Sequence, residues 1–236
     1  MPTPVPVFGK AVESRYNPAD NKGKLWRFLR GDSLGQVVMQ ASMRYLMPPE
    51  VEARREQVLR VYREAFAPPP YNKTGADVSS FAEALSRHTR RQGFRLVAAV
   101  EGQDGPLLGF AYGYISAPGQ WWHDLVAQAM DPALAAEWLG DAFEFVELAV
   151  APQAQGRGLG GRLHDALLAG LPHQRAVLST MQAETVALRL YRRRGWVVLL
   201  EGFRFPNVAR PYLVLGLDLT RSKAVSPGSA PAQAVG

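Results

Sequence analysis

The feature that most constrains this 236-residue chain is a strand, a glycine-rich turn and a helix in direct succession. The apolar run from Phe143 to Ala151 predicts a strand that Pro152 ends, and the spacing of apolar residues from Gly158 to Ala169 predicts an amphipathic helix. Glycines occupy positions 156, 158 and 160. Because the first amides of a helix lack internal acceptors and the helix dipole adds positive potential, this turn is suited to a pyrophosphate. Arg157 could add a charge.

Three interpretations of the turn compete. A Walker-type loop fails, because no lysine followed by serine or threonine comes after the glycines. Gly156, Gly158 and Gly161 satisfy the G-x-G-x-x-G fingerprint of dinucleotide-binding folds. Against it, residues 152–155 separate the turn from the end of the strand, and only about 75 residues remain for further β-α units. The third interpretation is a flexible turn with a glycine that packs the helix.

A longer pattern favours the phosphate-binding interpretation. Residues Gln155 to Gly160 match Q/R-x-x-G-x-G/A. Together, F-V-E-L-A-V-A-P-Q-A-Q-G-R-G-L-G and the later A-L-R-L-Y-R-R-R-G-W resemble the GNAT family of N-acetyltransferases. The resemblance is specific over Phe143 to Trp196 and extends by element order from about residue 40 to 219. It implies the α/β acyl-CoA N-acyltransferase fold, with flanking helices and a mixed central sheet splayed between its fourth and fifth strands.

The resemblance also implies an activity and a cofactor site. The enzyme would move an acetyl group directly from acetyl-CoA to an amine, a small molecule or a protein, within a ternary complex. The strand before the turn would lend main-chain groups to the pantetheine arm, and the turn would bind the pyrophosphate. Many family members have asparagine where this chain has Glu184, which would bring negative charge towards the cofactor unless it caps the following helix. The implied cofactor residues are Leu148, Ala149, Val150, Gln155, Gly156, Arg157, Gly158, Leu159, Gly160 and Glu184.

Acyl transfer from a thioester to an amine needs a base, a donor to the oxyanion and an acid for the departing thiolate. By resemblance, Tyr191 is the general acid. Glu147 and Glu144 are the candidate bases, and water oriented by one of them is a further option. Being three residues apart, they would face opposite sides of a regular strand. We favour Glu147, which immediately precedes the pantetheine-binding residues, and expect a backbone N–H near Val150 as the oxyanion donor.

The remaining pattern predicts a single domain at residues 37–220, between a mobile basic arm at 1–36 and a disordered tail at 221–236. Three tryptophans between 118 and 140 belong to an irregular stretch with a weak helical pattern. Acceptor-side candidates are the segments 68–72 and 121–124. We expect strands at 37–46, 94–101, 107–116, 143–151 and 176–181, near Val197 and at 212–219, and helices from 48 to 67, 78–91, 158–169 and 184–194.

Composition limits the function classes. Of the formal charge of +6, the arm carries +3 and the tail +2, which leaves +1 for the domain and argues against nucleic acid as a partner. The absence of cysteine excludes thiolate chemistry, and four scattered histidines predict no metal site. Without a signal-like or membrane-spanning run we expect a cytoplasmic protein. A homodimer is compatible with this fold. Two other functions stay open: a non-catalytic acyl-CoA-binding or regulatory module, and a dinucleotide-binding oxidoreductase.

Overall fold

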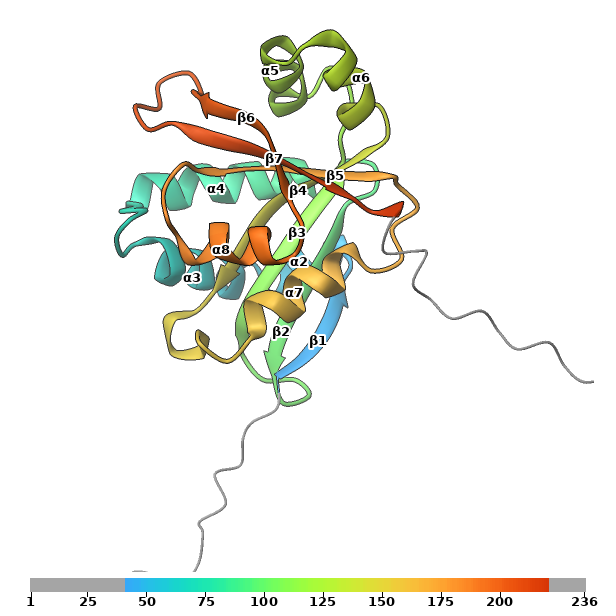
Figure 1. The fold of residues 1–236 in the computed structure, drawn as a ribbon. Coiled ribbons are helices and arrows are strands. Elements are labelled where there is room, and N and C mark those ends of the chain that lie inside the picture. The colour runs from blue at the N-terminus through green and yellow to red at the C-terminus, as the bar shows by residue number, and fades with distance from the viewer. Residues whose placement is uncertain (1–40, 221–236) are drawn as a thin grey trace, which may run out of the picture. The chain divides into compact units, whose positions relative to one another are not determined.

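The computed structural model describes residues 41–220, which form a mixed sheet of seven strands in the order β1-β2-β3-β4-β5-β7-β6, with helices on both faces (Figure 1). The proposed arm and tail, and the first four residues of the strand expected at 37–46, lie outside the described residues. The strands are β1 (Ala41–Leu46), β2 (Arg95–Glu101), β3 (Leu107–Ile115), β4 (Ala142–Val150), β5 (Arg175–Met181), β6 (Val197–Phe203) and β7 (Tyr212–Asp218). The helices are α2 (Pro48–Ala53), α3 (Arg55–Phe66), α4 (Gly75–His88), α5 (Trp121–Ala129), α6 (Pro132–Leu139), α7 (Leu159–Leu168) and α8 (Val186–Arg193), with a 3₁₀ turn η1 (Pro152–Ala154).

The alternation of side chains along each strand divides the core into two layers. On one face, α3 and α4 pack on Leu96, Phe110 and Tyr112. On the other face, α7 and α8 pack on Val97, Ala111 and other strand residues that are adjacent in sequence to those of the first layer. The pair α5–α6 forms a third cluster with β5 and β7 through Val177 and Val214, and stands apart from α3 and α4 (Figure 1). The sheet is therefore covered on both sides, as apolar strands of this kind require.

Strands β4 and β5 pair only at their first three positions. The parallel ladder joins Ala142, Phe143 and Glu144 to residues 175–177, and then ends. On the far side of β4, the antiparallel ladder with β3 continues to Val150. Among residues 41–220, the edge of β4 that faces β5 therefore has no partner strand beyond Glu144. This confirms the expected splay between the fourth and fifth strands, and it leaves backbone groups for a ligand to bind.

A β-bulge in β4 corrects the expectation that Glu144 and Glu147 face opposite sides. Tyr112 pairs with Glu147 and Tyr114 with Glu144, although Gly113 between them pairs with Phe145 alone. Val146 is thus an extra residue on β4. Since Tyr112 and Tyr114 are two residues apart, both point to the α3–α4 face, and so do the two glutamates opposite them. The bulge thus places Glu144 and Glu147 on the same face of the sheet, whereas a regular strand would place them on opposite faces.

The helices differ from the sequence expectation mainly at three places, and the helix expected to reach Arg91 also ends earlier, at His88. The helix expected from Pro48 breaks at Arg54, where φ is −105° and ψ is 15°, into α2 and α3. The helix expected at 78–91 begins instead at Gly75, because the Thr74 hydroxyl accepts a hydrogen bond from the Asp77 amide and the Asp77 carboxylate accepts one from the Thr74 amide. The stretch 118–140 is not irregular, since it contains α5 and α6.

Gly113 is required by the close approach of β3 and β4 beside the bulge. A Cβ at this position would lie 2.2 Å from the Glu144 carbonyl oxygen and 2.4 Å from the Phe143 ring. We expect Gly113→Ala to lower the free energy of unfolding by about 1–3 kcal/mol, the usual cost of overpacking. Gly75→Ala is the matched control, because no atom lies within 4 Å of its added Cβ. Urea unfolding of both variants measures the difference. Equal stability of the two would contradict this packing.

Candidate functional site

The turn after β4 presents a run of free backbone amides. Gly156 and Gly158 both have φ of +74°, and a Cβ at either position would meet no atom within 4 Å. The first bond into α7 is donated by the Arg162 amide to the Gly158 carbonyl, at 3.1 Å. Within residues 41–220, the amides of 156–161 donate no hydrogen bond. Such a row of amides at a helix N-terminus binds an anion, and the exposed Arg157 lies within it.

The end of β4 directs main-chain groups toward the gap. The Ala151 amide donates to the Leu108 carbonyl at 2.9 Å, so the main chain of Ala151 faces β3. By the alternation of an extended chain, Val150 and Leu148 face the gap. Two of these groups have side-chain partners: the Val150 carbonyl accepts from Gln155 Nε2 at 2.8 Å, and the Leu148 amide donates to Glu147 Oε1 at 3.2 Å. The Leu159 side chain is buried, so only its backbone is available to a ligand.

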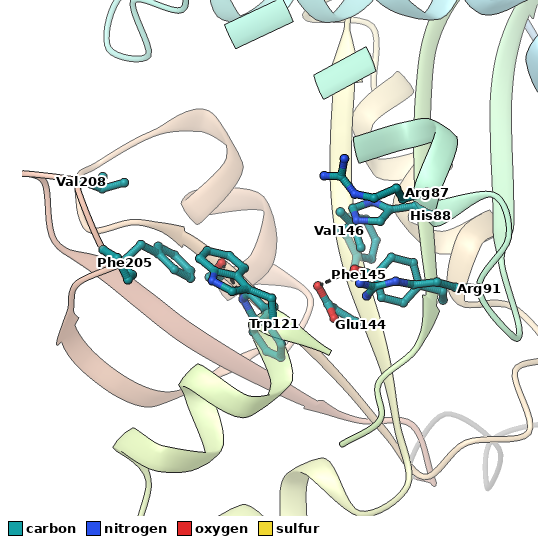
Figure 2. Close-up of a pocket in the computed structure, with 13 residues that line it drawn as sticks. Arg87, His88, Arg91, Trp121, Glu144, Phe145, Val146, Phe205 and Val208 are labelled. Carbon is teal, nitrogen blue, oxygen red and sulfur yellow. Dashed lines mark hydrogen bonds between the residues drawn. The ribbon is translucent and has the colours of Figure 1, made fainter. Parts of the chain in front are cut away.

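A cavity of about 430 Å³ lies on the α3–α4 face, between the end of α4 and the start of α5 (Figure 2). It adjoins the point where β4 and β5 part, and side chains from both faces of the sheet reach it: Glu144 from one and Phe145 from the other. Its size is within the range of small-molecule sites. The lining residues are Arg87, His88, Arg91, Tyr114, Trp121, Trp122, Glu144, Phe145, Val146, Ser179, Phe205, Pro206 and Val208.

Glu144 is the carboxylate of this cavity. Its side chain is 4% exposed, its Oε1 accepts a hydrogen bond from the Tyr114 hydroxyl at 3.1 Å, and its Oε2 has no hydrogen-bond partner among the described residues. Burial raises the pKa of Glu144 to about 7, although Tyr114 and Arg91 act in the opposite direction. A buried carboxylate oxygen without a donor is costly. The second carboxylate oxygen of Glu144 is therefore available to accept a proton or a hydrogen bond from a molecule in the cavity.

Glu147 lies on the same face but does not line the cavity. Burial raises the pKa of this partly buried carboxyl to about 8, against the lowering effect of the Leu148 amide and Lys73. Its negative charge in turn raises the pKa of Tyr191 and of Tyr71. Glu147 thus interacts electrostatically with nearby tyrosines, whereas Glu144 lines the cavity.

Tyr191 projects from α8 on the opposite face and is 6% exposed. Its ring packs against Phe145, His164 and Trp196 at centroid distances of 6.1, 6.3 and 5.7 Å. Burial raises its pKa well above the usual value, so the phenol keeps its proton at neutral pH. Its electrostatic interaction with Glu147 joins residues of the two core layers, which approach one another where β4 and β5 part.

The cationic wall of the cavity was not predicted from the sequence. Arg87 and His88 come from the last turn of α4, and Arg91 follows it. The Arg91 guanidinium lies 4.4 Å from the centroid of the Tyr114 ring. Neither arginine forms an ion pair with a carboxylate of residues 41–220. The i, i+4 spacing of Arg87 and Arg91 was the available signal, since it places both on one side of a helix end.

His88 is uncharged at neutral pH. Burial, supported by the charges of Arg91 and Arg87, lowers its pKa to about 4. Its Nδ1 lies 3.1 Å from the Tyr112 hydroxyl, a hydrogen bond that anchors the ring. The positive charge of this wall therefore comes from the two arginines alone.

The aromatic wall opposite was placed among the acceptor-side candidates. Trp121 is 59% exposed and stacks on Phe205 of the β6–β7 loop at 5.4 Å. Trp122 is buried and donates from Nε1 to Ser179 Oγ at 3.1 Å. His123, also proposed, is buried and bonded to Ser116, so it contributes to packing. Of the segment 68–72, no residue lines the cavity.

Glu184 does not cap α8. Thr185 is the cap, since its hydroxyl accepts the Leu188 amide at 3.0 Å. The exposed Glu184 carboxylate forms an ion pair with Arg192 at 2.6 Å. This pairing offsets the negative charge that, from the sequence, was expected to oppose the cofactor.

Residues 41–220 contain neither a group of metal-binding side chains nor a helix long and apolar enough to cross a bilayer. The groups that the site offers to a ligand are thus carboxylate, phenol, guanidinium and backbone amide.

Comparison with known proteins gives concordant findings. Residues 55–196 match the Acetyltransferase (GNAT) family. A GCN5-like protein acetyltransferase of Mycobacterium tuberculosis is 35% identical over 202 residues, which cover 74% of this chain and 96% of the relative. An acetyltransferase structure of the GNAT family from Desulfovibrio desulfuricans superposes with a TM-score of 0.52 at 19% identity, covering 76% of this chain and 99% of that one. An acetyltransferase of Salmonella typhimurium with acetyl-CoA gives 0.50 at 16% identity, covering 82% and 99%.

Proposed function

Because this chain belongs to the GNAT family and transfers an acetyl group from acetyl-CoA to an amine, we propose that Glu144 is the base of this reaction and the adjoining cavity its acceptor site. Family membership decides against the dinucleotide-binding oxidoreductase. A non-catalytic module on the same fold would bind acetyl-CoA without turnover, so the activity assays below test that alternative. The observation that carries the proposal is the buried Glu144 carboxylate, which has a free oxygen and lies at the fork of β4 and β5.

The chain's own residues fit acetyl-CoA. Acetyl-CoA supplies the activated acetyl thioester. The free amides of 156–161 and Arg157 would bind its pyrophosphate, and the main chain of Leu148 and Val150 would line its pantetheine arm, whereas the main chain of Ala149 faces β3. Open space at Gly156 and Gly158 leaves room for the phosphate groups. We also propose the exposed Gln155, which bonds the Val150 carbonyl, as a brace between turn and strand.

The base step follows from the position of Glu144. The acceptor amine must lose a proton as its nitrogen forms the new bond to the acetyl carbon. Glu144 Oε2 accepts that proton, and the Tyr114 hydroxyl fixes the orientation of the carboxyl group. A carboxyl with a pKa of about 7 is half ionised near neutral pH, which suits it to take a proton and to release it again.

The acid step is assigned to Tyr191. As the carbon–sulfur bond breaks, the sulfur gains the electron pair and needs a proton. The raised pKa keeps the Tyr191 phenol protonated, and no hydrogen bond to another residue of 41–220 holds its hydroxyl elsewhere. The charge of Glu147 contributes to the raised pKa of Tyr191, and its carboxylate accepts a hydrogen bond from the Leu148 amide. We therefore assign Glu147 a positioning role.

Titration calorimetry with acetyl-CoA, NAD and NADP tests the cofactor site. We expect acetyl-CoA alone to bind, and Gly158→Glu to weaken that binding by about 10²-fold or more, because the new carboxylate would face the pyrophosphate. Gly158→Ala is the matched control: it places the same side-chain strain at φ +74° without a charge. An unchanged affinity in Gly158→Glu, or a preference for NAD, would overturn the cofactor assignment.

A protein amine is the second acceptor class to consider, because a relative at 35% identity is named a protein acetyltransferase. We further propose a cytoplasmic location, on the absence of cysteine and the need for acetyl-CoA.

A further inference from the structure

The acceptor cavity has two charged sites of opposite sign close together. Glu144 accepts a hydrogen bond from the Tyr114 hydroxyl, and the Arg91 guanidinium lies over the ring of the same tyrosine. One aromatic ring thus separates the base from a cation. Figure 2 shows Arg87 and Arg91 extending from one wall, Glu144 beside them and Trp121 with Phe205 opposite. A ligand that satisfies both sites must carry its amine and its anion only a few bonds apart.

The charge balance of the cavity favours an anionic group on the acceptor. Arg87 and Arg91 contribute two positive charges against the one carboxyl group of Glu144, neither forms an ion pair with a carboxylate in the described chain, and His88 is neutral. A polycationic amine would be repelled by this wall. A carboxylate would accept charge-assisted hydrogen bonds from it. Arg91 is partly buried and held on the Tyr114 ring, so it is the better ordered of the two.

The opposite wall is apolar and accessible. Trp121 and Phe205 are stacked, and the exposed Val208 lies beside them. Exposed aromatic surface in a cavity gains from contact with an apolar group. The three features are a base, a cationic wall and an aromatic wall, all within one cavity of about 430 Å³.

From this arrangement, and on the basis of the acetyl transfer proposed above, we propose that the acceptor is an α-amino acid with an apolar or aromatic side chain. Its amine lies at Glu144, its carboxylate binds Arg91 with support from Arg87, and its side chain lies against Trp121 and Phe205.

The test compares acceptors that differ only in the carboxylate. Phenylalanine, phenylalanine amide and phenethylamine are assayed with acetyl-CoA, beside a lysine peptide without acidic residues and spermidine. We expect kcat/KM for phenylalanine to exceed that for the amide by about 10–10²-fold, the value of one or two charge-assisted hydrogen bonds. Arg91→Gln should remove most of this preference. Because Arg91 also lowers the pKa of Glu144, the two acceptors are compared well above pH 7, where the base is ionised, and the loss should be larger for phenylalanine than for the amide. Arg87→Gln, at an exposed position, should reduce it less.

Arg90→Gln is the matched control, because Arg90 is exposed and lies outside the cavity. Equal rates for phenylalanine and its amide, an equal loss of both in Arg91→Gln, or turnover of the lysine peptide alone would overturn the proposal while leaving acetyl transfer intact. Calorimetric titration of the coenzyme A complex with phenylalanine and its amide tests the same preference without turnover. Equal or absent binding there would also overturn it. Failure of acetyl-CoA itself to bind would instead overturn the proposed function.

Discussion

Glu144→Gln should lower kcat by about 10²–10⁴-fold, the usual contribution of a general base. Glutamine keeps the size of the side chain and its amide oxygen can still accept from Tyr114, but it cannot take a proton. Because Glu144 forms no ion pair with another residue of 41–220, the substitution leaves no buried charge without its partner, and the variant should fold. Initial-rate assays at saturating substrates measure the loss, and calorimetry should find acetyl-CoA binding unchanged.

The pH profile gives a signature of the same residue. Burial raises the pKa of Glu144 to about 7, so a proton occupies the base below that pH and kcat should fall as pH falls through 7. This limb should be missing from the residual activity of Glu144→Gln. Glu147→Gln is the matched comparison: if that variant, and not Glu144→Gln, lost activity together with the limb, the base would be Glu147.

Tyr191→Phe should lower kcat by about 10²–10⁴-fold, because the departing sulfur would lose its proton donor. The ring contacts with Phe145, His164 and Trp196 remain, so the free energy of unfolding should change little. Single-turnover assays separate the chemical step from cofactor binding. Tyr71→Phe is the control, since its hydroxyl also interacts electrostatically with Glu147 but is bonded to Thr185. A larger loss in Tyr71→Phe than in Tyr191→Phe would contradict the assignment.

Glu144 and Glu147 show a limit of predicting from sequence which face of a strand a side chain occupies. Side-chain alternation predicts opposite faces for residues three apart, and only the pairing with β3 reveals the extra residue at Val146. The bulge depends on how β3 and β4 pair, at the point where the absence of a side chain on Gly113 leaves room for the Phe143 ring. The residue propensities of a single strand do not predict it. The proposal that Glu144 rather than Glu147 is the base therefore rests on the tertiary structure.

Charged residues of the cavity illustrate the same limit. Arg87 and Arg91 look like ordinary solvated residues at a helix end, and Phe205 lies in a loop without a distinctive pattern. Segments more than a hundred residues apart bring them around Glu144. Trp121 was among the acceptor-side candidates of the segment 121–124, while His123 of the same segment is buried in a contact with Ser116.

Local sequence was sufficient to identify the cofactor half of the protein. Strand, turn and helix are contiguous between Phe143 and Ala169, so their geometry follows from local rules: apolar periodicity, glycines that permit positive φ, and the free amides of a helix N-terminus. The acceptor half could be proposed only from the folded chain, because its candidate base, its cations and its aromatic wall come from distant segments. Their distances depend on a bulge, a parting of two strands and the packing of an inserted helix pair, which are properties of long-range contacts alone.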